Sequence, residues 1–214
     1  MSEITLTSPF TPSQADRDAL NSMPHRVIKC PKKQSVYKSQ EYAYHLYRVK
    51  NGLVKDFRLT ADGVEQITHF YLPGEIFGWE ALIQPYYASH TASIFDSELE
   101  QFHIGSLKDS PLFIHQMNSL LIHEQIKTKS HIALLNKTHA TARLSAFILN
   151  INKRLNTSHS LHAFNFPRNE IANYLGLSVE TVCRSINQLK KINAIKIEKT
   201  RIHIIDINKL TDFL

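Results

Sequence analysis

The sequence predicts an α+β protein in three parts: an N-terminal antiparallel β jelly roll or sandwich, a long helix, and a C-terminal winged helix-turn-helix. Three observations support this prediction. The first 105 residues consist of short stretches rich in β-branched and aromatic residues. A glycine-free segment with helical patterning follows from Pro111. The last third has the order helix, tight turn, helix, β-hairpin. The corresponding domain boundaries are 1–110, 111–137 and 138–214.

Seven short strands are predicted in the N-terminal part. Turn signals separate several of them: Asn-Gly at 51–52, Asp-Gly at 62–63 and Pro-Gly at 73–74. Strands of this length, with turns at close intervals, are typical of a sandwich or jelly roll. The seven stretches are RVIKC, QSVYK, HLYRVKNG, LVKDFRL, EQITHFYL, TASIF and LEQFHI. A short helix over residues 11–23, capped by Thr11, is expected to precede them.

The segment that begins at Pro111 carries one stripe of residues at i, i+3, i+4 spacing. A helix of about 25 residues would be about 38 Å long, at 1.5 Å per residue, which is more than a small barrel needs. We therefore expect it to connect the two domains and to pair with a second copy of the chain. An ordinary helix lying on the sandwich is the alternative. The expected dimer-interface residues are Met117, Leu120, Leu121, Glu124, Ile132 and Leu135.

The C-terminal part begins with a helix over 139–155 and a polar loop over 156–166. Pro167 is expected at the first position of the next helix, where its missing N–H costs nothing. A glycine at 176 ends that helix, and Ser178 is the expected N-cap of the following one, which extends to residue 191. Two short strands, AIKIE and RIHIID, then form a hairpin.

The surplus of positive over negative charge is confined to this C-terminal part. The formal net charge is +6. Residues 1–137 contain 14 Lys and Arg against 14 Asp and Glu, whereas residues 138–214 contain 11 against 5. A basic module joined to a neutral one indicates a polyanionic partner for the basic part. An incidentally basic surface is the alternative.

The helix SVETVCRSINQLKK, over 178–191, has two contrasting faces. Three apolar residues at i, i+4 and i+7 should face the core: Val182, Ile186 and Leu189. The opposite face and the N-terminal end carry the residues that we expect to contact DNA bases: Val179, Glu180, Cys183 and Arg184. Arginine donates two hydrogen bonds to guanine, and glutamate accepts one from cytosine. Phosphate contacts are expected from Arg168, Ser178, Thr181, Lys190 and Lys191. The alternative is a solvated face with an i, i+4 Glu–Arg pair.

The stretch RNEIANYLGLSVETVCRSINQLKK resembles the DNA-binding signature of the Crp/Fnr superfamily, specifically its Fnr/FixK branch. LYRVKNGLVKDFRLTADGVEQITHFYLPGEIFG is similar to the cyclic-nucleotide-binding-like barrel of these regulators, and ARLSAFILNI resembles the helix that enters their DNA-binding domain. The resemblance covers roughly residues 25–210. It implies a homodimeric transcriptional regulator that binds a palindrome in double-stranded DNA and contacts RNA polymerase. The branch pattern of Val, Glu, a small residue and Arg falls on Val179, Glu180, Cys183 and Arg184, which implies TTGAT-type half-sites.

Two departures from the family bear on the signal that the barrel senses. Members that bind cyclic AMP hold its phosphate with an arginine a few residues past the Gly-Glu turn. Gly74 and Glu75 form that turn here, but no arginine occurs between Leu59 and Ala142, and a buried phosphate without a cation is costly. The sequence has two cysteines, too few for a four-thiolate cluster. Neither a cyclic nucleotide nor an iron–sulfur cluster is therefore expected.

An effector-gated regulator remains the alternative function, with haem, nitric oxide or a cyclic nucleotide as the signal. His69 and His90 are the candidate haem ligands. Four histidines, at 115, 123, 131 and 139, recur every eight residues, so they spiral around a helix and form no metal-binding face. Haem is not favoured by these observations, and no cofactor or metal ion is predicted.

Cys183 is a candidate redox switch. It is expected on the DNA-facing side, beside Arg184 and close to a helix N-terminus, where a thiol is reactive. Oxidation would add bulk and then negative charge against the DNA phosphates. A small side chain with no sensing role is the alternative.

The remaining sequence features argue against an enzyme and against a membrane location. No apolar run approaches the length of a membrane span. The N-terminus has neither a basic nor an apolar signal region, and two cysteines provide no disulfide framework. A cytoplasmic location is expected. There is no glycine-rich phosphate loop, metal-hydrolase motif or nucleophile elbow.

Overall fold

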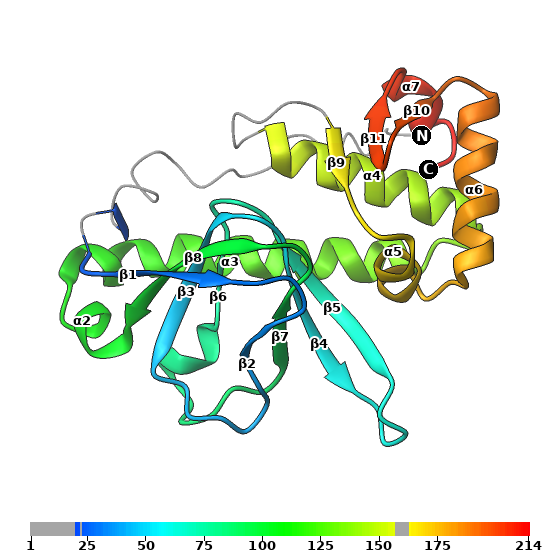
Figure 1. Cartoon of the computed structure of the whole chain (residues 1–214). Coiled ribbons are helices and arrows are strands. Elements are labelled where there is room, and N and C mark those ends of the chain that lie inside the picture. Colours follow the sequence, from blue (N-terminus) through cyan, green and yellow to red (C-terminus); the bar gives the residue numbers. More distant parts are fainter. Residues whose placement is uncertain (1–19, 22, 157–162) are drawn as a thin grey trace.

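The computed structural model describes residues 20–21, 23–156 and 163–214. Two β-sheets lie along one side of a long helix, and a smaller domain lies at one end of it (Figure 1). The predicted α+β architecture is confirmed. The helix expected over 11–23 lies mainly outside the described residues.

Two four-stranded sheets make up the N-terminal part. All seven predicted strands are present, and all strand pairs are antiparallel. The first sheet has the order β1 (Arg26–Cys30), β8 (Ser97–His103), β3 (His45–Asn51), β6 (Ile76–Phe77). The second has the order β2 (Ser35–Tyr37), β7 (His90–Ser93), β4 (Val54–Leu59), β5 (Glu65–Tyr71). Strand β6 and the short 3-10 helix η1 (Trp79–Leu82) were not predicted.

The turn between β3 and β4 needs a glycine. Gly52 has φ +100°, and a Cβ at this position would lie 2.1 Å from Ser97 Oγ. Ser97 cannot easily move, because its hydroxyl donates to the Phe95 carbonyl and accepts a hydrogen bond from Leu53 N–H. The Asn-Gly signal in the sequence therefore marks a turn whose close packing excludes other side chains.

The long helix α3 (Pro111–Leu135) follows the short helix α2 (Ile104–Lys108). Ser110 caps it, since its Oγ accepts a hydrogen bond from Phe113 N–H. Phe113 and Leu120 are 1% and 5% exposed and pack into a barrel cluster with Phe102 and Leu107. One face of α3 is therefore covered by the protein's own sheets.

This packing bears on the residues predicted for the dimer interface. Leu120 is buried in the chain's own core, and Met117 packs against the same cluster. Glu124 pairs with Lys127, and Leu135 packs against a second core cluster. Of the predicted set, Ile132 is 54% exposed and Leu121 is half-buried. The stripe chosen from spacing is thus mainly the face turned toward the barrel. The exposed large apolar residues of α3 are Leu112, Ile114, Ile122, Ile126 and Ile132.

The described residues of the C-terminal domain form four helices and a three-stranded sheet. The helices are α4 (Ala140–Asn156), α5 (Arg168–Leu175), α6 (Val179–Lys191) and α7 (Ile207–Thr211). The sheet has the order β10 (Ile195–Glu198), β11 (Arg201–Ile204), β9 (Ala163–Asn165). The predicted winged helix-turn-helix is confirmed. Pro167 is the N-cap of α5 rather than its first residue, β9 lies in a segment predicted as loop, and α7 was not predicted.

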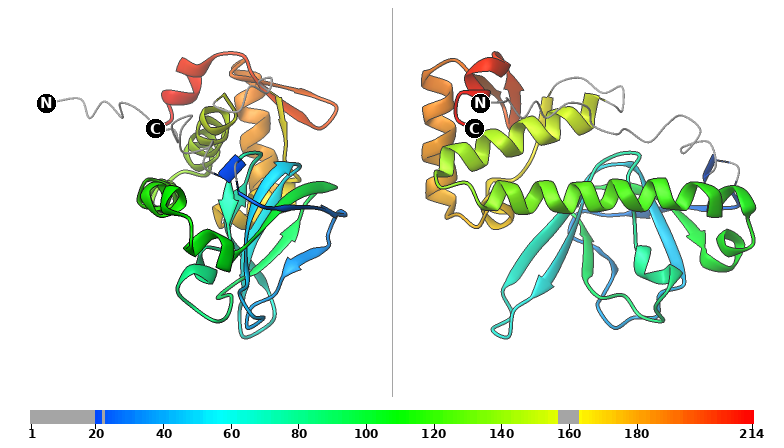
Figure 2. Two further views of the ribbon diagram at one scale, coloured as in Figure 1. Left: turned by 90° about the vertical axis from the view of Figure 1, so that its left-hand side faces the viewer. Right: turned by 180° about the vertical axis from the view of Figure 1, so that it is seen from behind.

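The two domains share one hydrophobic core. Phe70 of β5 lies 4.9 Å from Phe166 and 4.7 Å from Tyr174, between ring centroids. Phe147 of α4 joins the same group. Figure 2 shows α4 running back along α3 from the end of that helix. The C-terminal domain therefore rests against the second sheet as well as being tethered to α3.

Candidate nucleic-acid interface

Helix α6 is positioned by its cap and its buried face. Ser178 Oγ accepts a hydrogen bond from Thr181 N–H at 3.1 Å, which confirms the predicted N-cap. Gly176 has φ +61° and ends α5 in the left-handed conformation that allows the tight turn. Val182 and Leu189 are fully buried. The opposite face of the helix must therefore point away from the domain.

That opposite face carries the predicted base-contact residues. The side chains of Glu180 and Arg184 are 79% and 71% exposed, and they form an i, i+4 ion pair with 3.9 Å between Nε and Oε1. Val179 is 46% exposed, and Cys183 is half-buried. Exposed ion pairs contribute less than about 1 kcal/mol. Both charged groups are therefore free to exchange their partner for a base edge.

The predicted phosphate contacts surround this face. Ser178 and Thr181 lie at the N-terminal end of α6, with their hydroxyl oxygens 2.8 Å apart. Lys190 and Lys191 are exposed at its C-terminal end, and Arg168 is exposed at the start of α5. The structure thus places two hydroxyl groups at the N-terminal end of α6, positive charge at its C-terminal end, and Arg168 beside the hollow that Ile186 lines.

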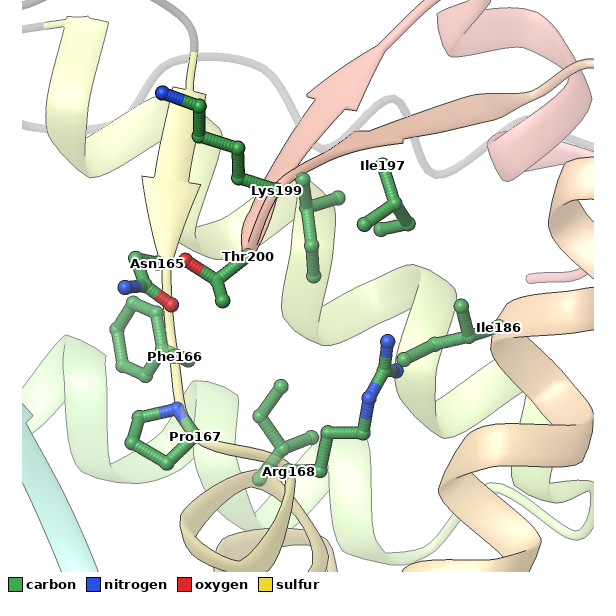
Figure 3. A pocket seen from close by; sticks show the side chains of 10 residues that line it. Asn165, Phe166, Pro167, Arg168, Ile186, Ile197, Lys199 and Thr200 are labelled. Atoms are coloured by element: carbon green, nitrogen blue, oxygen red, sulfur yellow. The ribbon is translucent and has the colours of Figure 1, made fainter.

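A hollow of about 160 Å³ lies between α5, α6 and the β10–β11 hairpin (Figure 3). Its floor is apolar and includes Ile186 and Ile202, which are both buried. Arg168 and Lys199 stand on its rim from opposite sides. The hairpin thus adds a basic side chain close to the surface assembled by α5 and α6. Sequence reasoning did not single out Lys199.

Two further polar residues that were not predicted hold α6 and α5 against α4. Thr141 donates a hydrogen bond to Gln188 Oε1 at 2.8 Å. Arg143 donates from Nη1 to the Leu175 carbonyl at 3.2 Å and from Nε to the Lys137 carbonyl at 2.9 Å. These residues appear as ordinary helix-surface positions in the sequence, because periodicity alone does not show which polar side chains are buried.

The comparisons with known proteins agree with this geometry. A model of the Crp-like helix-turn-helix domain matches residues 142–213, and a cyclic nucleotide-binding domain model matches residues 27–102. The "Anaerobic regulatory protein" of Haemophilus influenzae is 30% identical over 214 residues, which cover 97% of this chain and 83% of that protein. The chain belongs to the Crp/Fnr family of transcriptional regulators.

Other Crp/Fnr proteins cover similar lengths. The "Fumarate and nitrate reduction regulatory protein" of Yersinia pestis is 30% identical over 200 residues, 90% of this chain and 80% of that protein. The solved structure of FixK2 from Bradyrhizobium japonicum is 26% identical, with a TM-score of 0.79 over 89% of this chain and 98% of that chain. The regulator TTHB099 from Thermus thermophilus, at 21% identity and a TM-score of 0.74, shares the fold. The family assignment and the DNA-binding domain are thus confirmed.

The barrel contains a buried carboxyl group. Asp56 is 8% exposed and accepts hydrogen bonds from three hydroxyl groups, those of Thr68, Ser89 and Thr91. Burial raises the pKa of Asp56, which the three hydroxyls partly offset. Tyr37 and Tyr87 stack with ring centroids 3.7 Å apart. The three hydroxyl groups are thus already engaged with a carboxyl group, whereas a phosphate is best held by cations and free donors.

The candidate ligands for metal or haem are scattered over the described parts of the chain. Cys30 is buried in β1, where its Sγ donates to the Gln34 carbonyl, and Cys183 lies in the other domain. His69 Nε2 lies 3.1 Å from Thr128 Oγ1, and the His90 ring stacks on Phe57. No three His, Cys, Asp or Glu side chains within the described ranges could hold one metal ion. The two cysteines do not fit a four-thiolate cluster.

None of the described helices has the length and apolar character needed to cross a membrane.

Proposed function

We propose that this regulator binds a palindromic, TTGAT-type DNA site as a homodimer, and that it does so without a cyclic nucleotide or an iron–sulfur cluster. The observation that carries the proposal is the exposed pair of Glu180 and Arg184 on α6, in the domain that holds the whole charge surplus. These residue types suit the cytosine and guanine of one G·C pair. The hydroxyl groups of Ser178 and Thr181 at the start of α6 and the two lysines at its end suit the flanking phosphates.

The exposed face of α3 supports a homodimer. Ile114, Ile122, Ile126 and Ile132 are each between 44% and 54% exposed on one helix. Placed at 100° per residue, Ile114, Ile122 and Ile132 lie within about 80° of one another, with Ile126 on the flank. Four large apolar residues in such a stripe are typical of a helix that pairs with another helix. A second copy of α3 would cover them and would place two α6 helices on one duplex.

Selection of bound DNA from a random pool tests the proposal. The wild type should enrich two TTGAT-like half-sites about one helical turn apart. Arg184→Ala should lose enrichment of the G·C pair in each half-site. Arg26→Ala, which removes an exposed arginine on the barrel, is the matched control and should give the wild-type motif. A pool that shows no enriched sequence with the wild-type protein contradicts the proposal.

Independence from a ligand rests on the barrel interior and on the cysteine count. No arginine occurs between Leu59 and Ala142, so a phosphate bound and buried by this stretch would have no arginine partner. Isothermal titration with cyclic AMP and cyclic GMP should give no binding heat. The purified protein should show no visible absorption band from iron–sulfur or haem. Saturable heat, or a band that correlates with DNA binding, would favour the effector-gated alternative.

We propose in addition that oxidation of Cys183 weakens DNA binding. The thiol lies on α6, one residue before Arg184, and is half-buried, so oxidants can approach it and added oxygen atoms would meet DNA. Peroxide treatment should reduce affinity in the wild type and not in Cys183→Ser. Cys30→Ser, at the buried thiol of β1, is the control and should lose affinity as the wild type does. Equal loss in the wild type and in Cys183→Ser rules the switch out.

As a regulator rather than an enzyme, the bound dimer is proposed to contact RNA polymerase in the cytoplasm. An exposed aromatic patch on the barrel is a suitable surface: Tyr42 and Tyr44 stack, Tyr86 lies 4.8 Å from Tyr42, and Ile83 is 85% exposed. Exposed aromatic patches mark protein interfaces. Tyr42→Ala should reduce transcription in vitro without changing DNA affinity. Unchanged transcription would remove this patch from the proposal.

A further inference from the structure

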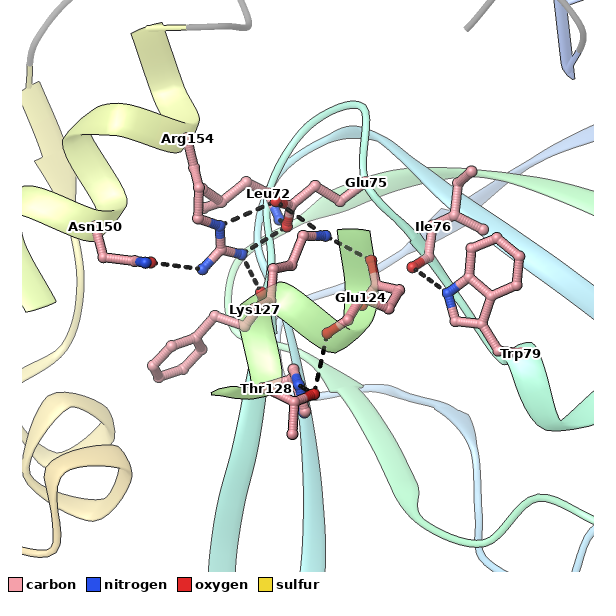
Figure 4. Close-up of polar contacts among 11 residues, drawn as sticks. Leu72, Glu75, Ile76, Trp79, Glu124, Lys127, Thr128, Asn150 and Arg154 are labelled. Carbon is pink, nitrogen blue, oxygen red and sulfur yellow. Dashed lines mark hydrogen bonds and ion pairs between the residues drawn. The ribbon is translucent and has the colours of Figure 1, made fainter. Parts of the chain in front are cut away.

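Four charged side chains meet where the barrel, α3 and α4 join (Figure 4). Glu75 lies in the turn between β5 and β6, Glu124 and Lys127 lie on α3, and Arg154 lies near the end of α4. Their side chains are only 14% to 20% exposed. The cluster therefore links three elements of the protein at a mostly buried position.

Arg154 and Glu75 form the centre of this cluster. Arg154 donates from Nε to Glu75 Oε1 at 3.0 Å and from Nη2 to Glu75 Oε2 at 2.6 Å. This is the bidentate geometry of a strong arginine–carboxylate pair. Arg154 Nη2 also donates to the Phe70 carbonyl at 2.5 Å, and the Leu72 N–H donates to Glu75 Oε2 at 2.9 Å. The guanidinium is thus fixed to the backbone of β5 as well as to the carboxylate.

Lys127 extends the cluster to α3. Its Nζ lies 3.3 Å from Glu75 Oε1 and 2.6 Å from Glu124 Oε1. Burial acts to raise the pKa of Glu75, but Arg154 and Lys127 outweigh burial and hold that pKa at about 2. The carboxylate is therefore ionised at neutral pH and remains paired with both cations.

A second attachment holds α5 to strands β4 and β5 of the barrel. Asn173 Oδ1 accepts a hydrogen bond from Ile67 N–H at 2.8 Å, and its Nδ2 donates to the Glu65 carbonyl at 2.7 Å. Glu170 lies 3.1 Å from Lys55 Nζ. The C-terminal domain is thus fixed to the barrel at two separate points, through α4 and through α5.

Helix α4 connects this cluster to the recognition helix. Arg154 lies near one end of α4, and Thr141, which is bonded to Gln188 of α6, lies near the other. The 13 steps between them span about 20 Å. A tilt of about 10° at the Arg154 end would therefore move the α6 end by about 3.5 Å, close to the rise of one base pair. Small changes in this attachment change where α6 meets DNA.

We infer that Glu75 and Arg154 are positioning residues for DNA recognition: their buried ion pair fixes the C-terminal domain against α3 and so sets the spacing between the two half-sites that a dimer accepts. The inference rests on the proposed function, because spacing has meaning only for a dimer on a palindrome. A buried ion pair adds little net stability compared with apolar packing. Its directional hydrogen bonds instead restrict the geometry of the groups that it joins.

The test uses a series of operators in which the distance between two identical half-sites increases in steps of one base pair. The affinity of the wild type for one spacing should be about tenfold or more higher than its affinity for the neighbouring spacings. Glu75→Gln, which removes the charge but keeps the size of the side chain, should reduce this preference to about threefold or less. Arg154→Lys, which cannot make the bidentate contact, should give a similar loss. The double variant should be no worse than either single variant, because both remove one interaction.

Glu98→Gln is the matched control, because Glu98 forms an exposed ion pair with Lys50 on the barrel, and it should keep the wild-type preference. Folding is checked by circular dichroism. If Glu75→Gln does not fold, Arg154→Lys, which retains a positive charge, decides the question. A folded variant with the wild-type spacing preference overturns the inference, whereas a wild type without any spacing preference overturns the proposed palindromic dimer itself.

Discussion

At the scale of single residues, Glu180 and Arg184 hold one another only weakly in the free protein. Their side chains are more than two-thirds exposed, and 3.9 Å separates Arg184 Nε from Glu180 Oε1. Such a pair is screened by salt and loses little when it is broken. The proposed contacts with bases therefore do not require a strong internal interaction to be broken first. Lys190 differs, because a lysine at the end of α6 can serve any phosphate and no base in particular.

The first prediction separates these two roles. Arg184→Ala should weaken binding to the selected operator by about 1–3 kcal/mol and leave non-specific binding almost unchanged. Lys190→Ala should weaken binding to all sequences alike and reduce the slope of log affinity against log salt by about one unit. Fluorescence anisotropy with operator and scrambled duplexes, at several salt concentrations, measures both quantities. Identical behaviour of the two variants would mean that α6 does not present this face to the bases.

At the scale of elements, α3 has one covered and one exposed apolar face. Phe113 and Leu120 pack on the barrel, whereas Ile122 and Ile126 are 54% and 44% exposed. The exposed pair lies at i and i+4, the spacing of neighbours on one side of a helix. A helix that is covered on one face by its own domain has only the other face available for a partner.

The second prediction concerns this exposed face. Ile122→Asp combined with Ile126→Asp should convert a dimer into a monomer, because two pairs of carboxylates would be buried without partners. Light scattering after size-exclusion chromatography measures the mass directly. Ile83→Asp, at an apolar residue of the barrel that is 85% exposed, is the control and should remain dimeric. A double variant that stays dimeric would place the interface elsewhere.

The elements were predictable from the sequence to different degrees. Strands and helices were found because alternation, turn residues and caps such as Ser178 are local signals. The stripe that includes Leu120 and Glu124 was found from its spacing, but its partner was not, because periodicity does not show whether a stripe packs against the chain's own barrel or against a second copy. Arg154 was missed for a different reason, because its partner Glu75 lies 79 residues away in the sequence. Local patterning predicted which face of α6 is exposed, and only tertiary contacts revealed what holds the helix in place.

At the scale of the whole molecule, the junction between barrel and C-terminal domain concentrates titratable groups. His69 of β5 faces α3, with Nε2 3.1 Å from Thr128 Oγ1. Burial, followed by the positive charges of His131, Arg154 and Lys127, lowers the pKa of His69 to about 4, although Glu75 acts in the opposite sense. Burial also lowers the pKa of His131. Below about pH 6.5, His69 therefore binds fewer protons in the folded protein than in the unfolded chain.

The third prediction follows from this difference in proton binding. The stability that comes from a neutral His69 should be complete above pH 6.5 and should be lost as the pH falls toward 4, by up to about 1.4 kcal/mol per pH unit. His69→Gln removes the titrating group, so thermal unfolding should show a smaller decrease in Tm between pH 7.5 and pH 5 than in the wild type. Two nearby carboxyl groups do not account for the difference. Burial raises the pKa of Glu124, but Glu124 titrates in the wild type and in the variant alike. Glu75, with its pKa at about 2, stays ionised in the folded state of both proteins. His115→Gln, at an exposed histidine of α3, should behave as the wild type. An unchanged pH dependence of Tm in His69→Gln would show that protonation of this histidine does not destabilise the junction between the domains.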